Sequence, residues 1–270
     1  MRKTFMVKEL HRAIRSKKNI AIVAFVVFVM FLNAYHDGWK TGLFASRAVD
    51  IADPADIEFY QRYFGNTYRV WKSSYSVIQV LIPLLLLIPY ALSFTIEKNS
   101  MYRYLLVSRE GNAKYLFHKV LAIVISGVLI VGFGEALFYG GSFLFTQHDN
   151  AGEYIAGIVG NAESFFYQDA KKYFFIVFAL HLVYYAAFLL FSVGVTSFLK
   201  NRIAILLLPF LISSMFELIM PPYMQPNVLL LPWVSDTYNI YGFAAMVVLY
   251  CFMGIACLLV SEKKYCRNGA

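Results

Sequence analysis

The residues most able to do chemistry are two glutamates that lie inside long apolar runs. Glu135 has two glycines and an alanine among its nearest neighbours, and Glu217 stands about one turn before the Pro221-Pro222 pair. A charge at the centre of a bilayer costs at least about 2.5–3.5 kcal/mol, so each carboxylate is expected to face protein or water. Two interpretations remain open: a transport pathway or proton-linked site, or a structural carboxylate satisfied by another helix or at the outer interface.

Signatures of catalysis and of nucleotide binding are absent from the sequence. The chain has no Gly-x-x-x-x-Gly-Lys-Ser/Thr phosphate loop, no His-Glu-x-x-His and no Gly-x-Ser-x-Gly. The histidines fall in different segments, at no spacing typical of a metal site. They are His11, His36, His118, His148 and His181. We therefore expect that this chain is not an enzyme and that it binds no cofactor or metal of its own.

The composition is typical of a membrane protein. Hydrophobic residues make up 60% of the 270-residue chain and charged residues only 15%, whereas soluble domains carry about 25% charged residues. The formal net charge of +8 would also suit a nucleic-acid-binding protein. The basic residues, however, lie at the ends of apolar runs and form no single stripe. We therefore expect contact with a lipid bilayer and none with nucleic acid.

Six apolar runs are long enough to predict transmembrane helices. The predicted spans are 19–35, 74–95, 119–141, 172–199, 203–220 and 238–261. The second contains Pro83 and Pro89, which predict a kink and freed backbone carbonyls. The segment 221–237 has four prolines and no basic residue. It is too interrupted for a full span, and we expect short helices there that dip into the outer leaflet.

The N-terminal segment, residues 1–18, places its apolar residues on one helical stripe among basic residues. This pattern predicts an amphipathic helix lying on the cytoplasmic face of the membrane; the alternative is an ordinary basic tail. Residues 19–261 then form one six-span transmembrane domain, and residues 262–270 form a cytoplasmic tail. The predicted fold class is an all-α membrane protein with six transmembrane helices, the interfacial helix and a short cytoplasmic helix.

The distribution of Lys and Arg predicts the orientation of the chain. Seventeen of the 24 lie in the N-terminal segment, in residues 96–119, in the short link 200–202 and at the C-terminus. The predicted loops on the other side hold the remaining seven. Because positive residues concentrate in short cytoplasmic segments, both termini are predicted to be cytoplasmic. We expect the protein to lie in the cell membrane.

The segment 94–121, FTIEKNSMYRYLLVSREGNAKYLFHKVL, joins the second predicted span to the third. It resembles the same connection in permeases of ABC transporters of the type-2 exporter class. In that family an aromatic residue is followed by a Glu, a Leu-rich helix, a turn, and a Lys at the start of the third span. The matching positions here are Phe94, Glu97, Leu105, Leu106, Ser108 and Lys119.

The resemblance implies a coupling helix that docks on a separate cytosolic ATPase. It also implies that the partner ATPase subunits use the ATP, and that the permease pairs with a second copy or a similar chain. The residues expected in the coupling contact are Glu97, Arg103, Leu105, Leu106 and Arg109. A short helix with aromatic and Arg anchors suits a pocket on a cytosolic protein. The alternative is a helix that only lies on lipid.

Three functional classes follow from these observations. The resemblance favours the permease subunit of an ATP-driven exporter, moving a hydrophobic or amphipathic substrate such as a peptide, lipid or drug. The alternative is a secondary transporter or channel that uses Glu135 and Glu217 inside the membrane. A membrane-embedded enzyme is disfavoured, because the sequence shows no nucleophile or metal constellation.

Overall fold

The computed structural model describes residues 5–47, 53–98, 101–146, 170–231 and 239–268. The regular structure within these ranges is helical, and six helices are long and apolar enough to cross a membrane. The prediction of an all-α, multi-pass membrane protein is confirmed at this level. The spanning helices cover Lys17–Arg47, Tyr75–Phe94, Asn112–Phe145, Lys171–Thr196, Arg202–Ile219 and Ile240–Lys264.

The elements follow one another along the chain with few long connections. The first half contains α1 (Phe5–Ile14), α2 (Lys17–Ala34), η1 (Tyr35–Trp39), α3 (Lys40–Phe44), η2 (Ala45–Arg47), α4 (Pro54–Phe64), α5 (Thr67–Ser73), α6 (Tyr75–Leu87), α7 (Ala91–Lys98) and α8 (Met101–Glu110). The second half contains α9 (Asn112–Phe145), α12 (Ala170–Thr196), α13 (Arg202–Ile219), η3 (Pro222–Met224), α14 (Pro226–Leu230) and α15 (Ile240–Asn268).

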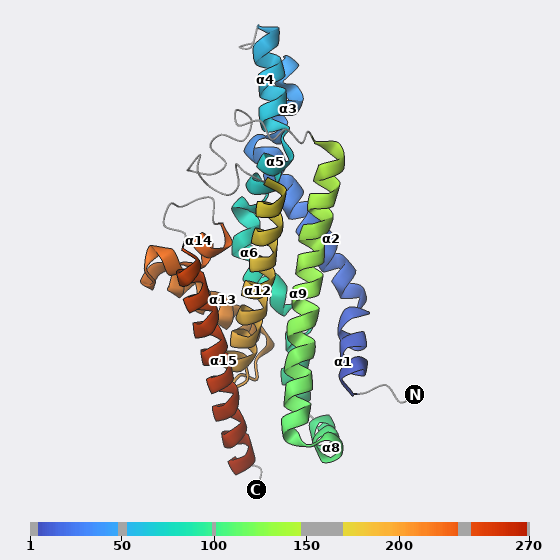
Figure 1. The fold of residues 1–270 in the computed structure, drawn as a ribbon. Helices are drawn as coiled ribbons and strands as arrows, with labels where there is room; N and C mark the ends of the chain where they lie inside the picture. Colours follow the sequence, from blue (N-terminus) through green and yellow to red (C-terminus); the bar gives the residue numbers. More distant parts are fainter. Residues whose placement is uncertain (1–4, 48–52, 99–100, 147–169, 232–238, 269–270) are drawn as a thin grey trace.

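The spanning helices form an elongated bundle whose two ends differ (Figure 1). The helices α1 and α8 and the C-terminal end of α15 lie at one end, whereas α3, α4 and α5 lie at the other. Both termini therefore lie at the same end of the bundle, as an even number of spans requires. The sequence prediction assigns that end to the cytoplasm.

Helix α12 is the centre of the bundle and packs against α6, α9, α13 and α15. A helix that is apolar all round is expected inside a bundle, and α12 buries a run of aromatic and aliphatic side chains. They include Tyr184, Tyr185, Phe188, Leu189 and Phe191. A Cβ added at Gly194 on α12 would lie 2.3 Å from the carbonyl oxygen of Gly254 on α15. These two glycines therefore let the two backbones meet directly.

The first span is longer than the predicted range 19–35. The helical path continues beyond Tyr35 through η1, α3 and η2 to Arg47. His36 and Asp37 end the apolar run, but both are exposed, so they do not end the helix. Gly38 has a non-helical backbone with φ 157° and marks the bend within η1. The prediction placed the boundary where hydrophobicity falls, whereas the backbone hydrogen bonds continue past it.

The proline break predicted in the second span is confirmed at Pro89. Helix α6 continues through Pro83 but ends at Leu87, and α7 begins at Ala91. Proline lacks the backbone N–H that an α-helix needs, so a break at this point is physically expected. The break turns Tyr90 toward a cluster of charged residues that is described below.

The third span begins at Asn112, seven residues before the predicted start at Lys119. Gly111, with φ +80°, separates α8 from α9 in a conformation that glycine adopts without strain. Lys119 therefore lies about two turns inside α9 and is fully buried, whereas the prediction placed it at the membrane surface.

The proline-rich segment before the last span folds into the two short helices η3 and α14. The predicted pair of short helices is therefore present, while residues 232–237 of that prediction lie outside the described ranges. Leu229 and Leu230 are 1% and 2% exposed, and α14 packs against α6 and α13. The last span begins at Ile240, and α15 continues to Asn268, past the predicted end at 261.

Single cysteines test the orientation of the bundle. In a variant whose three native cysteines are replaced by alanine, Asp56→Cys places one thiol on the exposed surface of α4, and restoring Cys266 places one near the C-terminus. We expect a membrane-impermeant maleimide to label position 56 in intact cells and Cys266 only after permeabilisation. Labelling of Cys266 in intact cells would reverse the orientation. Asn66 is an unsuitable probe, because it is buried and caps α5.

Candidate functional site

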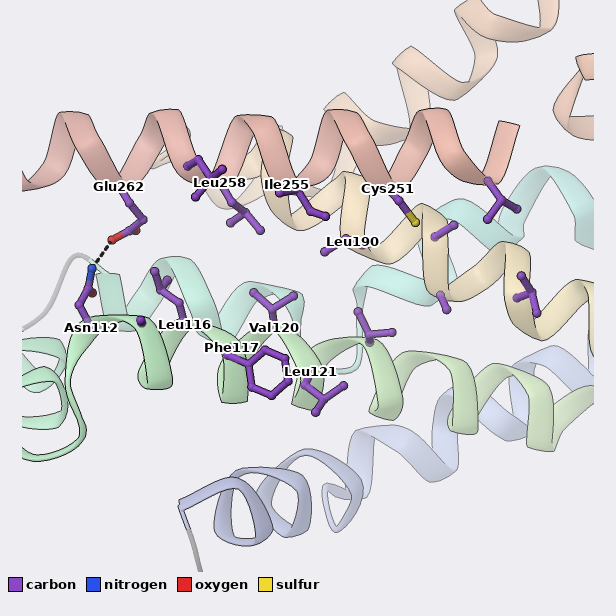
Figure 2. A pocket seen from close by; sticks show the side chains of 17 residues that line it. Asn112, Leu116, Phe117, Val120, Leu121, Leu190, Cys251, Ile255, Leu258 and Glu262 are labelled. Atoms are coloured by element: carbon purple, nitrogen blue, oxygen red, sulfur yellow. Dashed lines mark hydrogen bonds between the residues drawn. The ribbon is translucent and has the colours of Figure 1, made fainter. Parts of the chain in front are cut away.

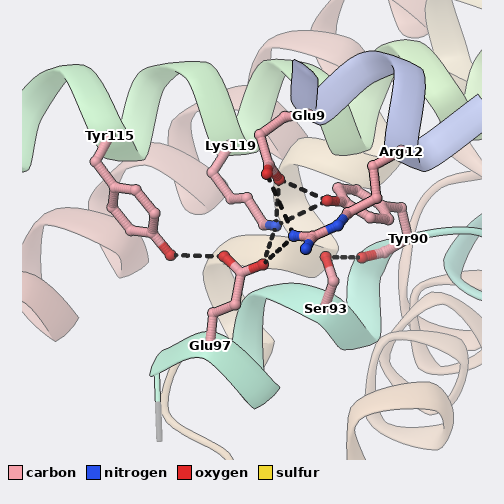
Figure 3. A network of polar contacts seen from close by, with 7 residues as sticks. All are labelled: Glu9, Arg12, Tyr90, Ser93, Glu97, Tyr115 and Lys119. Atoms are coloured by element: carbon pink, nitrogen blue, oxygen red, sulfur yellow. Dashed lines mark hydrogen bonds and ion pairs between the residues drawn. The ribbon is translucent and has the colours of Figure 1, made fainter. Parts of the chain in front are cut away.

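A buried cluster of charged side chains joins the N-terminal helix to two other helices (Figure 3). The Lys119 ammonium on α9 lies 2.6 Å from Glu9 Oε2 and 2.8 Å from Glu97 Oε1. Arg12 Nη1 lies 3.5 Å from Oε1 of each of these glutamates. The charges of two carboxylates and two cations therefore cancel. Such compensation is the condition under which buried ion pairs persist.

Two tyrosines complete the hydrogen bonds of this charged cluster. The Tyr90 hydroxyl donates to Glu9 Oε2 at 2.5 Å and accepts from Lys119 Nζ at 3.1 Å. Tyr115 donates its hydroxyl to Glu97 Oε2 at 3.2 Å. Tyr115 lies four residues before Lys119, so both project from the same face of α9.

The cluster sets the protonation state of Glu9. Burial by itself would raise the pKa of Glu9. The hydrogen bond and charge of Lys119, together with Tyr90 and Arg12, outweigh burial and hold the pKa below its ordinary value. The stability that Glu9 contributes is therefore present above the unfolded-state pKa and is lost as the pH falls through the lower folded-state pKa. The attachment of α1 is thus insensitive to pH near neutrality.

The helix α8, predicted to couple to an ATPase, is fixed to the rest of the chain through Arg103. Its guanidinium is 1% exposed and lies 2.5 Å from Glu262 Oε2 on α15. Arg103 also donates to Asn112 Oδ1 at 3.2 Å. The expectation that Arg103 is available to a partner's carboxylate is therefore corrected, because its charge is already paired inside the chain.

The other predicted coupling residues differ in how far they are exposed to solvent. Leu105 is 59% exposed and Arg109 is also exposed, while Leu106 is half-buried. Glu97 is only 7% exposed and belongs to the charged cluster with Lys119. The structure thus brings together the Glu and Lys of the sequence motif as a direct ion pair, and leaves Leu105 and Arg109 open to a partner.

An apolar groove of about 940 Å³ runs between α9, α12 and α15 (Figure 2). Its walls are almost entirely aliphatic, with Leu116 from α9, Leu190 from α12 and Ile255 from α15 among the lining residues. At one end Asn112 Nδ2 donates to Glu262 Oε2 at 3.2 Å, across the space between α9 and α15. The groove therefore ends at the same two residues that Arg103 of α8 holds.

Glu135 lies in a separate buried cluster of polar side chains. It is 2% exposed and accepts hydrogen bonds from the hydroxyls of Tyr75, at 3.0 Å, and of Tyr185. His181 Nδ1 lies 3.2 Å from the Tyr75 hydroxyl, and His181 Nε2 lies 2.8 Å from the Leu230 carbonyl oxygen. The carboxylate faces protein, as predicted for a charge inside a span. Helices α6, α9, α12 and α14 all contribute to this cluster.

Glu217 does not join Glu135. Its Oε2 accepts from the backbone N–H of Asn227 at 3.1 Å, so this carboxylate ties α13 to the start of α14. Glu217 is half-buried and lines a smaller pocket of about 300 Å³ between α6, α13 and α14. The two glutamates of the sequence analysis thus hold different ends of α14: Glu217 contacts its first turn, and the Glu135 cluster contacts Leu230.

Several residues of these sites were missed by sequence reasoning. Glu9 carried a signal, because it is the only acidic residue among the basic residues of 1–18. His181 was set aside because no other histidine or cysteine stood at a metal-ligand spacing. Glu262 and Asn112 carried no signal, because each is polar and lies just outside a predicted span, where polar residues are ordinary.

Within the described ranges, no three His, Cys, Asp or Glu side chains lie close enough to hold a metal ion. The charged cluster and one end of the groove are neighbours, because Asn112, Tyr115 and Lys119 all lie in the first eight residues of α9. The Glu135 cluster lies farther along α9, 16 residues or roughly 24 Å from Lys119. Comparison of the chain with protein-family models, with curated proteins and with solved structures gave no match.

Proposed function

We propose that this chain is the permease subunit of an ATP-driven ABC exporter of the type-2 class. Two permease chains would pair in the cell membrane, and each would contact a separate cytosolic ATPase subunit that binds and hydrolyses ATP. The chain itself contributes the transport path and no catalytic residue. The sequence resemblance over residues 94–121 motivates this proposal, and the surroundings of α8 support it.

The observation that carries the proposal is the way in which α8 is attached. One side of the helix is fixed by the buried pair between Arg103 and Glu262, and the other side presents Leu105 and Arg109 outward. A short helix that only rests on lipid does not need a buried ion pair to a spanning helix. The buried pair would pass a displacement of α8 on to the spanning helix α15.

The contacts of Arg103 could also transmit a movement of α8 to the apolar groove. Displacement of α8 by the closing ATPases would pull on Glu262 and Asn112, which lie at the end of the apolar groove. Glu97, which comes just before α8, would pass the same movement to Lys119 on α9. The helices α9 and α15 would then shift relative to each other and change the width of the groove between them.

The groove supports a hydrophobic or amphipathic cargo. Its volume of about 940 Å³ lies in the range of binding sites for drug-sized molecules, and apolar side chains dominate its walls. Leu116, Leu190 and Ile255 offer no hydrogen bonds, so an apolar chain or ring would be favoured over a polar solute.

Substitutions at the exposed positions of α8 test the coupling contact. We expect Leu105→Ala and Arg109→Glu each to weaken ATPase binding by about tenfold or more, since a buried Leu contributes about 1.5–3 kcal/mol and tenfold corresponds to 1.4 kcal/mol. The measurement is co-purification of a phosphate-loop ATPase from native membranes, followed by ATP hydrolysis in nanodiscs. Leu43→Ala is the matched control, because Leu43 is 53% exposed at the opposite end of the bundle.

Two results would count against the permease proposal. One is the failure of any phosphate-loop ATPase to co-purify with the unaltered chain from its native membrane. The other is an ATPase complex that the Leu105 and Arg109 substitutions leave as strong as the Leu43 control does. In that case α8 would be only an interfacial helix.

A secondary transporter or channel is the second candidate, favoured by the burial of Glu135 beside His181. An ionisable pair inside a membrane bundle is a common feature of ion-linked transporters. This candidate predicts transport in vesicles that contain no ATPase, driven by an ion gradient and abolished by Glu135→Gln. Transport that strictly requires the ATPase and ATP would exclude it.

A further inference from the structure

The hydrogen bonds around Glu135 restrict how many protons the cluster can hold. The Leu230 carbonyl oxygen can only accept a hydrogen bond, so His181 Nε2, 2.8 Å away, carries a proton and donates it. The protonation state of the imidazole is then decided at Nδ1. That nitrogen lies 3.2 Å from the hydroxyl oxygen of Tyr75.

The Tyr75 hydroxyl stands between a carboxylate and an imidazole. Its oxygen lies 3.0 Å from Glu135 Oε2 and 3.2 Å from His181 Nδ1, but its single proton can be donated to only one of them. The other group must supply the proton for its own contact with Tyr75. Either Glu135 is ionised and His181 is doubly protonated, or Glu135 is protonated and His181 is neutral. Both arrangements satisfy the same contacts, and both are neutral overall.

Any other number of protons disturbs the cluster. With one proton more, Glu135 and His181 would both direct a proton at the Tyr75 oxygen, and the site would be positive. With one proton fewer, both would compete for the proton of Tyr75, and the site would be negative. Glu135 is 2% and His181 1% exposed, so water cannot compensate either charge. The arrangement with one shared proton is therefore strongly favoured.

We propose that Glu135, Tyr75 and His181 form a proton-binding site that holds one exchangeable proton inside the membrane-spanning bundle. In the transfer step, the proton on Glu135 Oε2 moves to the Tyr75 oxygen while the original hydroxyl proton of Tyr75 moves to His181 Nδ1. One O–H bond breaks at Glu135 and one at Tyr75, and one O–H bond and one N–H bond form. The step needs no other reactant and leaves the net charge unchanged.

The site and its surroundings are built from five helices: α5, α6, α9, α12 and α14. Among the described residues, the phenol of Tyr185 on α12 also contacts the site and donates to Glu135 Oε1 in both arrangements. The Tyr184 ring lies behind Tyr185, with ring centroids 6.4 Å apart. Helix α5 places the Trp71 ring edge-on to Tyr75, with ring centroids 5.9 Å apart. Helix α14 contributes only the Leu230 carbonyl, so His181 links the proton site to the proline-broken segment before the last span.

Nitrogen NMR of the histidine rings tests the proposal. The full-length chain is labelled with ¹⁵N-histidine in lipid nanodiscs, and the His181 signal is assigned as the one lost in His181→Gln. We expect its Nδ1 shift to lie between the neutral and the doubly protonated values and to stay constant across about pH 5–8. The exposed residues His11 and His36 supply histidine signals from outside the buried site for comparison.

Two substitutions make the test specific. Glu135→Gln keeps the shape of the side chain and imitates the protonated carboxyl, because its amide can donate to Tyr75 and accept from Tyr185. We expect it to move the His181 Nδ1 signal fully to the neutral position. Tyr75→Phe removes the bridging hydroxyl and should make the His181 signal dependent on pH. Tyr184→Phe removes an equally buried hydroxyl on the same helix as His181 and should leave the signal unchanged.

Two outcomes would overturn the proposal. A His181 signal that already lies at the neutral position in the unaltered chain, and does not respond to Glu135→Gln, would show that no proton is shared. A His181 signal that changes with pH across this range, in the unaltered chain and in Glu135→Gln alike, would show an isolated imidazole. The measurement uses neither an ATPase nor a cargo, so its failure leaves the permease proposal untouched.

Discussion

Replacement of Lys119 by methionine should cause one of the largest losses of stability available to a single substitution in this chain. It removes the fully buried cation that lies between Glu9 and Glu97 and leaves these two buried carboxylates without their shared ammonium. Breaking a buried ion pair by removing one partner typically costs about 3–5 kcal/mol. We expect a loss of this size, measured as unfolding of the purified protein in detergent, together with faster proteolysis of α1.

A triple variant separates lost charge from lost packing. Glu9→Gln and Glu97→Gln combined with Lys119→Met remove all three buried charges, so most of the stability should return. Lys200→Met is the control, because Lys200 is exposed and surface substitutions usually change stability by less than about 0.5 kcal/mol. Equal stability of Lys119→Met and Lys200→Met would show that the charged cluster does not hold α1 in place.

Reversal of charge at Arg103 should be nearly as damaging. Arg103→Glu places a carboxylate against Glu262, which is 8% exposed, and removes the only cation within 2.5 Å of it among the described residues. Loss of the pair costs about 3–5 kcal/mol, and repulsion of the two carboxylates adds to it. We expect lower thermal stability in detergent and detachment of α8, seen as cleavage between α8 and α9 by a protease.

The reciprocal double variant is the decisive control. Arg103→Glu combined with Glu262→Arg restores a pair of opposite charges and should recover a large part of the stability. Arg109→Glu, on the same helix but exposed, should leave stability unchanged while weakening ATPase binding. If Arg103→Glu is as stable as Arg109→Glu, then α8 is not fixed by this ion pair. A substitution at Arg103 is therefore a poor test of ATPase docking, because it also changes how α8 is attached to the rest of the chain.

The sequence by itself was sufficient to predict an all-α protein with six membrane-spanning helices. Long apolar runs bounded by charges require helices in a bilayer, since every backbone polar group must be satisfied within its own segment. Pro89 interrupts the second span for the equally local reason that proline cannot donate a hydrogen bond. Both effects act over a few residues, and so both could be predicted from residue types alone. The spacing of Glu97 and Lys119 was likewise visible as part of a motif.

Only the tertiary structure decided which residues meet. Lys119 pairs with Glu9, which is 110 residues away in the chain, and Arg103 pairs with Glu262, which is 159 residues away. Hydrophobic periodicity shows which face of a helix is apolar, but six apolar helices can pack in many orders. The close contact of Gly194 with Gly254, which sets α12 against α15, is one of the contacts that select the order. The groove and the shared-proton site exist only once that choice is made, because each is built from side chains of at least three different helices.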